Sequence, residues 1–190
     1  MQGVDDMTHK SKRSIAWLTT TALLMGMTVV MCAVSIPVPG GHLYLCDAII
    51  VTAAILLDPA AAFLVGGVGT FLGDLLFYPA PMFVSLVSHG LQAILISVFA
   101  HYVLKKHPML SAGIGALLGG ALMVVGYTLG RIFVYAAPDL TREAAIEISI
   151  LKLPFEILQA FVGSAVGLLL CGKGGLRRLY GKMQQRMRTE

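Results

Sequence analysis

The segment HLYLCDAIIVTAAILLDPAAAFLVGGVGTFLGDLL, from His42 to Leu76, lies between long apolar stretches and still contains three acidic residues. A charged side chain in lipid is costly and is normally kept only where it faces protein, water or a ligand. The segment is also rich in Gly and Ala, which allow helices to approach one another closely. We therefore expect a membrane-embedded chain that handles a polar group inside the membrane.

The composition supports an all-α integral membrane protein. Of the 190 residues, 57% are hydrophobic and only 13% are charged, whereas soluble domains have about 25% charged residues. The net charge of +4 comes from basic clusters that each adjoin an apolar stretch. This pattern indicates cytoplasmic anchoring and argues against nucleic-acid binding. The clusters are Lys10, Lys12 and Arg13, then Lys105 and Lys106, and then residues 173–188.

The apolar stretches predict six transmembrane helices. A spanning helix needs about 20 apolar residues, so the second stretch is short on its own. The first has 22 residues, more than the ~7–15 apolar residues of a cleavable signal peptide. The six stretches are Ile15–Ile36, Ala48–Leu57, Ala60–Phe77, Pro81–Leu104, Met109–Val134 and Ile146–Leu170.

An even number of spans puts both termini on one side, and the positive charges place that side in the cytoplasm. The expected organisation is a cytoplasmic segment (1–14), a transmembrane domain (15–170) and a basic cytoplasmic tail (171–190). The tail carries enough Lys and Arg to lie on an anionic inner leaflet.

Small residues at helical spacing predict close helix contacts. Ala22 and Gly26 form a small-xxx-small step on the first span, and such a step serves either internal packing or a partner helix. Glycines also gather on the third span, from Gly66 to Gly73, and on the fifth, from Gly113 to Gly126.

Polar residues in and near the spans gather in the outer half of the membrane, because successive spans alternate in direction. Any single pair, such as Asp74 with Arg131, could be a structural salt bridge, but the whole set indicates a small-molecule site open to the exterior. The candidate binding residues are His42, Tyr44, Asp47, Asp74, His89, Gln92, Tyr127, Arg131, Lys152, Glu156 and Gln159.

The sequence offers no pattern typical of an enzyme: it contains no HExxH, GxSxG or Walker A motif. The three cysteines, Cys32, Cys46 and Cys171, and the five histidines lack metal-ligand spacing, so we expect no metal and no cofactor. Two other classes stay open, an intramembrane enzyme and an autonomous channel or assembly protein. The uncharged stretch Leu75–Leu104 gives little support to a channel.

Several motifs resemble the substrate-binding (S) components of energy-coupling factor (ECF) transporters, and most closely their hydroxymethylpyrimidine-type branch. The element Leu153–Gln159 is similar to a Pro-Phe-Asn-x-x-Gln motif of that branch, with Glu156 in place of Asn. Cys46 and Asp58 stand where Gly is usual. The other matching motifs are Tyr44–Asp47, Asp58-Pro59, Gly66-Gly67-Val68-Gly69 and Gly73-Asp74-Leu75.

The resemblance implies a multi-pass protein of a prokaryotic plasma membrane that captures a water-soluble vitamin from outside. It would deliver the vitamin through a transmembrane coupling subunit and two ABC-type ATPases, and it would have no ATPase or enzyme activity of its own. Ala22 and Gly26 would form the docking motif for the coupling subunit. The expected ligand is a hydroxymethylpyrimidine or pyridoxine type whose ring lies between Tyr44, His89 and Tyr127, with pantothenate and cobalamin as alternatives.

Overall fold

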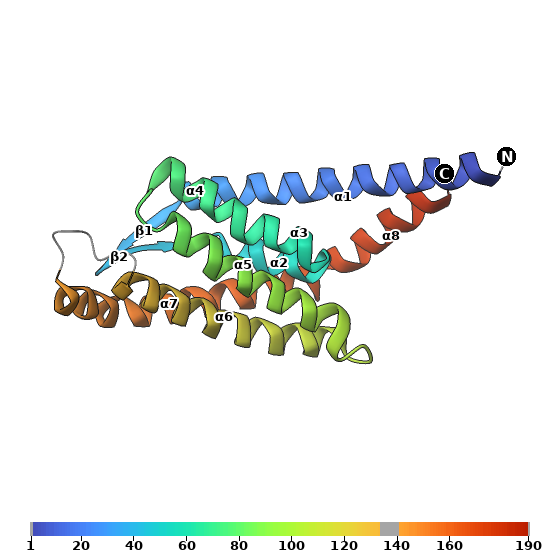
Figure 1. Ribbon diagram of the computed structural model, residues 1–190. Coiled ribbons are helices and arrows are strands. Elements are labelled where there is room, and N and C mark those ends of the chain that lie inside the picture. Colours follow the sequence, from blue (N-terminus) through green and yellow to red (C-terminus); the bar gives the residue numbers. More distant parts are fainter. Residues whose placement is uncertain (1, 134–140, 190) are drawn as a thin grey trace.

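The computed structural model describes residues 2–133 and 141–189, with side chains for 15–133 and 141–186. It is helical apart from one short hairpin (Figure 1). A π-helical turn at Leu64–Val68 joins α3 to α4, and another at Phe99–Val103 extends α5. The elements are α1 (Gln2–Ala33), β1 (Ser35–Val38), β2 (Gly41–Tyr44), α2 (Asp47–Leu56), α3 (Pro59–Phe63), α4 (Gly69–Phe77), α5 (Met82–Val98), α6 (Pro108–Phe133), α7 (Arg142–Cys171) and α8 (Leu176–Thr189).

Five helical segments are long and apolar enough to cross a membrane, and they correspond to five of the six predicted spans. The end of the first was predicted wrongly, because α1 stops at Ala33 and Ile36 lies in β1. Val134, the predicted end of the fifth span, lies outside the described residues. The five segments are Ile15–Ala33, Pro59–Phe77, Met82–Val103, Pro108–Phe133 and Arg142–Cys171.

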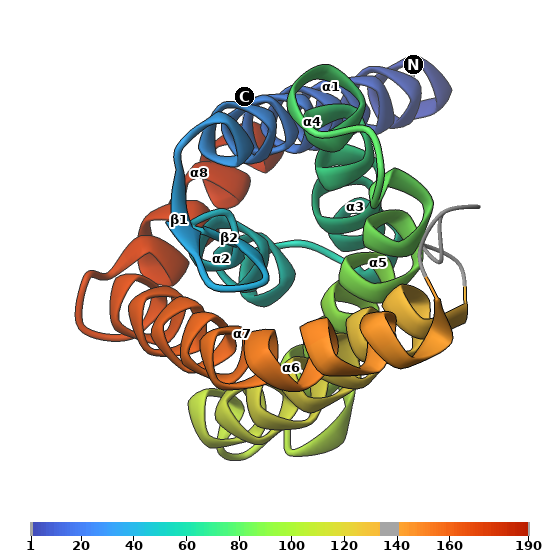
Figure 2. The same cartoon turned by 90° about the vertical axis from the view of Figure 1, so that its left-hand side faces the viewer.

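The predicted second span is the ten-residue helix α2. At 1.5 Å per residue it is about 15 Å long, which is half the thickness of the hydrocarbon core. The helix is therefore too short to cross a membrane on its own. Figure 2 shows α2 and the hairpin inside a ring formed by the other helices. Seven of its residues, from Asp47 to Ile55, are buried, so α2 is the core of the bundle.

Glycines on α7 allow it to pack directly on α2. A Cβ at Gly163 would lie 2.3 Å from the Asp47 Cβ, and one at Gly167 would lie 2.6 Å from Val51 Cγ1. No side chain fits at either position without a shift of α2. Some of the glycines predicted to make close contacts behave similarly, since a Cβ at Gly73 would meet Cys32 at 2.6 Å, whereas Gly26 and Gly113 have no atom within 4 Å.

The hairpin of β1 and β2 was not predicted from the sequence. Its antiparallel strands pair Ser35 with Tyr44 and Val38 with Gly41. Gly40 has φ +81°, a conformation that Gly adopts without strain, and Pro39 before it favours a turn. Strand β2, which contains His42 and Tyr44, lies beside α2 within the ring of helices (Figure 2).

The break between α2 and α3 is a helix cap. The Asp58 carboxylate accepts hydrogen bonds from the backbone N–H groups of Ala60 (3.0 Å) and Ala61 (3.1 Å), and Pro59 occupies the first helical turn. Asp and Pro are favoured at these two positions. The Trp17 indole donates a hydrogen bond to the same carboxylate. Asp58 therefore has a structural role, which explains why an acid stands in this stretch.

The two ends of the bundle differ in what they carry. Both termini and the turn between α5 and α6 lie at one end, the termini end, while the β-turn of the hairpin and the turn between α4 and α5 lie at the other, the hairpin end (Figure 1). The basic cluster Lys105–Lys106 belongs to the α5–α6 turn. The three basic clusters of the sequence are therefore on the elements that reach the termini end.

Candidate functional site

A pocket of about 270 Å³ lies at the hairpin end, between the hairpin, the α4–α5 turn, α6 and α7. Four of the residues predicted from the sequence line it, namely Tyr44, Tyr127, Arg131 and Lys152. They come from three elements that are far apart in the chain, so the fold brings them together. The remaining lining residues are Gly40, Gly41, Tyr78, Ala80, Pro81 and Ile148.

A group of three charged side chains, two of them buried and the third partly buried, closes the α6–α7 side of the site. Arg131 donates a hydrogen bond from Nη2 to Oε1 of Glu156, and Lys152 Nζ lies 3.8 Å from the same oxygen. Arg131 is 7% exposed and Glu156 is 4% exposed. The other two atoms of this pair, Arg131 Nη1 and Glu156 Oε2, are buried and have no hydrogen-bond partner among the described residues.

Asp74 belongs to a separate hydrogen-bonded chain. The Ser85 hydroxyl donates to the Asp74 carboxylate and also lies in hydrogen-bond contact with the Tyr127 hydroxyl. Among the described residues Arg131 forms its ion pair with Glu156 and not with Asp74. The structural pairing of Asp74 with Arg131 considered from the sequence is therefore wrong. Asp74 reaches the pocket through Ser85 and Tyr127.

Asp47 is the centre of a deeper polar network that joins α2, α5 and α7. Its carboxylate accepts one hydrogen bond from Gln92 Nε2, at 3.0 Å, and another from Gln159 Nε2. His89 Nδ1 lies 2.7 Å from Gln92 Oε1. Gln159 Oε1 in turn accepts the backbone N–H of Tyr44, at 2.9 Å. The network thus fixes the hairpin on the bundle beneath the pocket.

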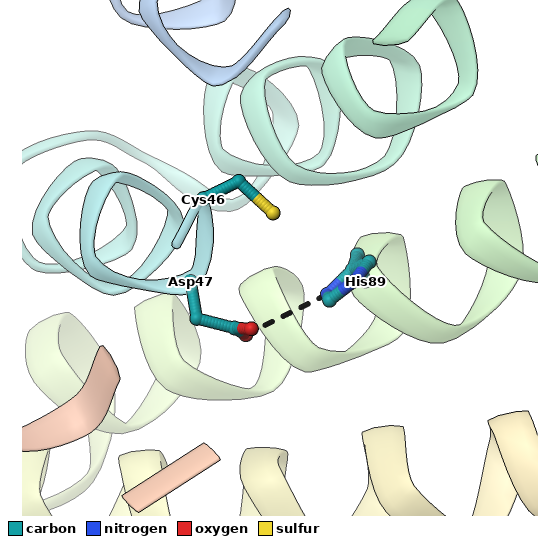
Figure 3. Close-up of side chains that lie close together, drawn as sticks. All are labelled: Cys46, Asp47 and His89. Carbon is teal, nitrogen blue, oxygen red and sulfur yellow. Dashed lines mark ion pairs between the residues drawn. The ribbon is translucent and has the colours of Figure 1, made fainter. Parts of the chain in front are cut away.

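Cys46, Asp47 and His89 lie close enough to suggest a metal site (Figure 3). Their ligand atoms are within 4.8 Å of one another, and His89 Nδ1 is 3.7 Å from Asp47 Oδ1. Both carboxylate oxygens of Asp47 already accept amide hydrogen bonds, however, and His89 Nδ1 is bonded to Gln92. These groups are satisfied by protein partners, so the geometry favours a structural network over a cation site.

Aromatic side chains form the other side of the site. His42 contacts Tyr78 edge-on, with 5.3 Å between ring centroids, and lies 6.4 Å from Tyr44. His89 makes a similar edge contact with Tyr127, at 5.3 Å. Tyr44 lines the pocket as well and adds a phenol ring to this aromatic side.

Two residues of the site, Tyr78 and Ser85, were not among the candidate binding residues predicted from the sequence. Ser85 precedes His89 by four residues on α5, so helical spacing from His89 and Gln92 indicates it. Tyr78 directly follows α4, and only its place in a short turn beside Asp74 could have suggested a role.

The face of α1 that carries Ala22 and Gly26 is not covered by any described residue of this protein. Both residues are exposed, and a Cβ at Gly26 would have no atom within 4 Å. Large apolar neighbours on α1, such as Leu23 and Met27, are exposed as well. Of the two roles open for this small-xxx-small step, internal packing is excluded by the structure.

Comparison with known proteins gives one consistent result. The structure is similar to that reported as "Structure and mechanism of the S component of a bacterial ECF transporter", with a TM-score of 0.64 and 22% sequence identity over 90% of this chain and 98% of the other. An uncharacterised protein of Pyrococcus woesei is 33% identical over 103 residues, which cover 53% of this chain and 68% of the relative. Residues 12–175 match the family model described as "ECF-type riboflavin transporter, S component". The chain therefore belongs to the family of ECF-type riboflavin transporter S components.

Proposed function

We propose that this protein is the substrate-binding membrane subunit of an ECF-type importer and captures a water-soluble vitamin in the pocket at the hairpin end. The observation that carries the proposal is the family match over residues 12–175. The S-component fold and the five apolar helices support a multi-pass membrane protein. The vitamin then passes through a transmembrane coupling subunit driven by two ABC-type ATPases, since S components supply no ATPase of their own.

In this proposal α2, with the hairpin before it and the cap at Asp58 after it, completes a sixth crossing. The hairpin carries the chain inward from the hairpin end, so a ten-residue helix is long enough for the remaining depth. The termini end, which carries the basic clusters, faces the cytoplasm of a prokaryotic cell, and the pocket opens to the exterior. In this orientation the polar residues of the pocket face the exterior, from which the vitamin enters.

The ligand we propose first is riboflavin, because it is named in the description of the matching family. A pocket of about 270 Å³ is just below the range for ligand sites, about 300–1,000 Å³, which argues against a ligand as large as a corrinoid such as cobalamin. The hydroxymethylpyrimidine or pyridoxine ligand expected from the sequence stays a prediction. A pyrimidine ring occurs in both riboflavin and hydroxymethylpyrimidine.

We assign the eleven candidate residues to two roles. Tyr44, Tyr127, Arg131, Lys152 and Glu156 bind the ligand directly, with His42 at the rim against Tyr78. The other five position them: Asp47, His89, Gln92 and Gln159 hold the hairpin and the floor of the site, and Asp74 orients Tyr127 through Ser85.

The exposed face around Ala22 and Gly26 is the proposed docking surface for the coupling subunit. Small exposed residues allow a partner helix to approach the α1 backbone closely, and no described side chain of this protein covers Gly26. The docking surface and the pocket lie on different parts of the bundle, so binding and delivery can be tested separately.

Equilibrium binding tests the proposal directly. The purified full-length protein, in detergent or nanodiscs, is titrated with riboflavin, hydroxymethylpyrimidine, pyridoxine, pantothenate and cobalamin. One saturable, high-affinity ligand is the expected result, and its uptake into cells should require co-expression of a coupling subunit and ATPases. Uptake by this chain alone would contradict the proposal and favour an autonomous channel.

A further inference from the structure

A second cavity, of about 410 Å³, lies at the termini end of the bundle. It is enclosed by the first part of the α1 span, the break between α2 and α3, the π-helical extension of α5, and α8, which runs from the end of α7 back beside α1 (Figure 1). Its described lining residues are all different from those of the pocket at the hairpin end. Its volume falls in the range of ligand sites, about 300–1,000 Å³, so the protein has room for a ligand at this end as well.

One face of α8 forms a wall of this cavity. Arg177, Tyr180, Gly181 and Gln184 line it, and residues three, four and seven positions apart lie on one side of a helix. Tyr180 packs against a buried apolar cluster, which holds this face towards the bundle. Arg178 is exposed and is not among the lining residues, so only the first of the two adjacent arginines faces the cavity.

The cavity lies at the depth where the apolar helical segments begin and end. Trp17 is the third residue of the first segment, Asp58 directly precedes the second, and Tyr102 is the last residue but one of the third. Such positions are at the level of the membrane–water interface, where Trp and Tyr are enriched beside the lipid headgroups. The ligands nearest to this cavity are therefore the headgroups of the surrounding membrane.

The charged side chains of the cavity leave one cation available. The Asp58 carboxylate is already engaged, because it caps α3 and accepts a hydrogen bond from the Trp17 indole, and a helix N-terminus favours a negative charge. Arg177 is partly buried and has no salt-bridge partner among the residues that the structure describes. A guanidinium can form two parallel hydrogen bonds with a phosphate, so Arg177 favours a ligand that carries one.

The uncharged polar groups of the cavity suit hydroxyl groups on the ligand. Tyr180 and Gln184 can each donate and accept hydrogen bonds. His101 Nδ1 contacts the backbone oxygen of Ser97 at 2.9 Å, so Nε2 is its remaining hydrogen-bonding atom. A phosphatidylglycerol headgroup joins a phosphodiester to a glycerol with hydroxyl groups, whereas a choline headgroup ends in a methylated ammonium without a hydrogen-bond donor. The lining therefore matches the first headgroup better than the second.

We propose that the cavity at the termini end binds an anionic phospholipid of the phosphatidylglycerol type, with its phosphate on Arg177 and its glycerol hydroxyls on Tyr180 and Gln184. Basic pockets between membrane helices are known to take such headgroups. The acyl chains follow exposed apolar side chains of the adjoining helices, such as Leu18 on α1. The bound lipid ties α8 to α1 and α5. The inference goes beyond vitamin capture and does not depend on which vitamin the protein carries.

Lipid titration of the full-length protein tests the inference. The protein is stripped of lipid in detergent and titrated with dioleoyl phosphatidylglycerol, dioleoyl phosphatidylcholine and glycerol 3-phosphate. Native mass spectrometry measures the fraction that carries one lipid, and thermal melting is recorded on the same samples. Phosphatidylglycerol should bind with a dissociation constant at least about tenfold lower than phosphatidylcholine, as expected for hydrogen bonds to a charged group, and should raise the melting temperature.

The matched variants are Arg177→Gln and Arg178→Gln. Both remove one positive charge from the same helix, so a general attraction of the basic tail for anionic lipid falls equally in the two. Arg177→Gln should weaken phosphatidylglycerol binding about tenfold or more, and Arg178→Gln should change it less than about twofold. Arg177→Lys keeps the charge but not the planar fork, so it should recover part of the affinity.

The outcomes separate a built site from general charge attraction. Selective binding of phosphatidylglycerol that depends on Arg177 and not on Arg178 supports the inference. Equal binding of the two lipids, or equal losses in the two Gln variants, overturns it, because the basic tail then attracts lipid only by its charge. Binding of glycerol 3-phosphate without retention of lipid also overturns it, since the cavity would then take a soluble phosphate ester. None of these results changes the proposed vitamin capture, which is measured with a different ligand at the other end of the bundle.

Discussion

Gln159 in α7 accepts a hydrogen bond from the backbone N–H of Tyr44 in the hairpin, at 2.9 Å, across 115 positions of the chain. The same carboxamide donates to Asp47 at the start of α2. One side chain thus connects the hairpin that covers the pocket, the central helix and the helix that carries Lys152 and Glu156. The hairpin position depends on this connection, because its own strands have only four residues each.

Replacing Gln159 with Leu should loosen the hairpin and weaken ligand binding. The change leaves Asp47 with one amide donor in place of two and removes the acceptor of the Tyr44 N–H. Each buried group that is left without a partner should lower the free energy of unfolding by about 1–3 kcal/mol. Hydrogen exchange of the Tyr44 amide should become faster, and Gln184→Leu on α8, at the opposite end of the bundle, should leave it unchanged. Unaltered exchange in Gln159→Leu would show that the hairpin is held by other contacts.

Arg131 and Glu156 should behave differently when changed together than when changed singly. Removal of one partner leaves a buried charge and typically costs about 3–5 kcal/mol, whereas an apolar pair of similar volume is often neutral. The double variant Arg131→Met/Glu156→Leu would leave Lys152 without its carboxylate partner, so Lys152→Met is added. The combined variant Arg131→Met/Lys152→Met/Glu156→Leu should therefore keep the thermal stability of the parent and lose ligand binding. Arg131→Ala alone should lower the thermal stability and also abolish ligand binding. Size-exclusion profiles after heating, with binding measured on the same samples, separate the two effects. Full affinity in the stable combined variant would remove these three residues from the site.

The close packing of α7 on α2 gives a prediction about stability. A Cβ at Gly163 would approach Asp47 Cβ to 2.3 Å and the Ala48 backbone N to 3.2 Å, so Gly163→Ala must displace the start of α2. We expect the free energy of unfolding to fall by about 1–3 kcal/mol, as is typical of overpacked sites, and ligand binding to weaken. A Cβ at Gly113 would have no atom within 4 Å. Gly113→Ala should therefore raise the free energy of unfolding by about 0.5–1 kcal/mol through its higher helix propensity. Heating curves of the two variants should shift in opposite directions.

The helical fold could largely be predicted from the sequence, because a stretch of about 20 apolar residues specifies a spanning helix almost regardless of context. The ten-residue α2 and the hairpin could not be specified in the same way. The strand residues Ser35–Val38 adjoin an apolar helix without a change in hydropathy, so the first span seemed to continue to Ile36. Only the pairing of β1 with β2, a tertiary feature, ends the helix at Ala33.

For the candidate site, the sequence indicated at which end of the bundle the polar residues lie, but not towards which neighbour each side chain points. Alternation of the spans places Asp74, Arg131 and Lys152 near the same end of the bundle, yet it contains no information on how each helix is rotated about its axis. Rotation decides that Arg131 contacts Glu156 and that Asp74 contacts Ser85. The free atoms of the Arg131–Glu156 pair depend on this rotation, so no pattern of residues could have predicted them.

Cys46 should be unreactive in the folded protein. Its side chain is only 1% exposed, and the thiolate, which is the reactive form, must contact the reagent before it can react. At pH 8, maleimide labelling followed by peptide mass mapping should find Cys46 labelled far more slowly than an exposed thiol introduced by Glu147→Cys, because the structure around Cys46 must open before the reagent reaches it. Fast labelling without denaturant would show that the hairpin opens readily.

The proposed docking surface on α1 gives a prediction that is independent of the pocket. Gly26→Leu places a large side chain where no described atom of this protein lies within 4 Å, so folding and ligand binding should be unaffected. Association with the coupling subunit should fall strongly, because a partner helix could no longer approach the α1 backbone. Gly113→Leu is the matched control, since it also introduces Leu at an open glycine but on α6. Co-purification of the ECF complex and vitamin uptake in cells are the measurements, with binding to the isolated subunit as the reference. If both variants assemble equally well and support equal uptake, the coupling subunit contacts another face, and the exposed small residues of α1 face lipid only.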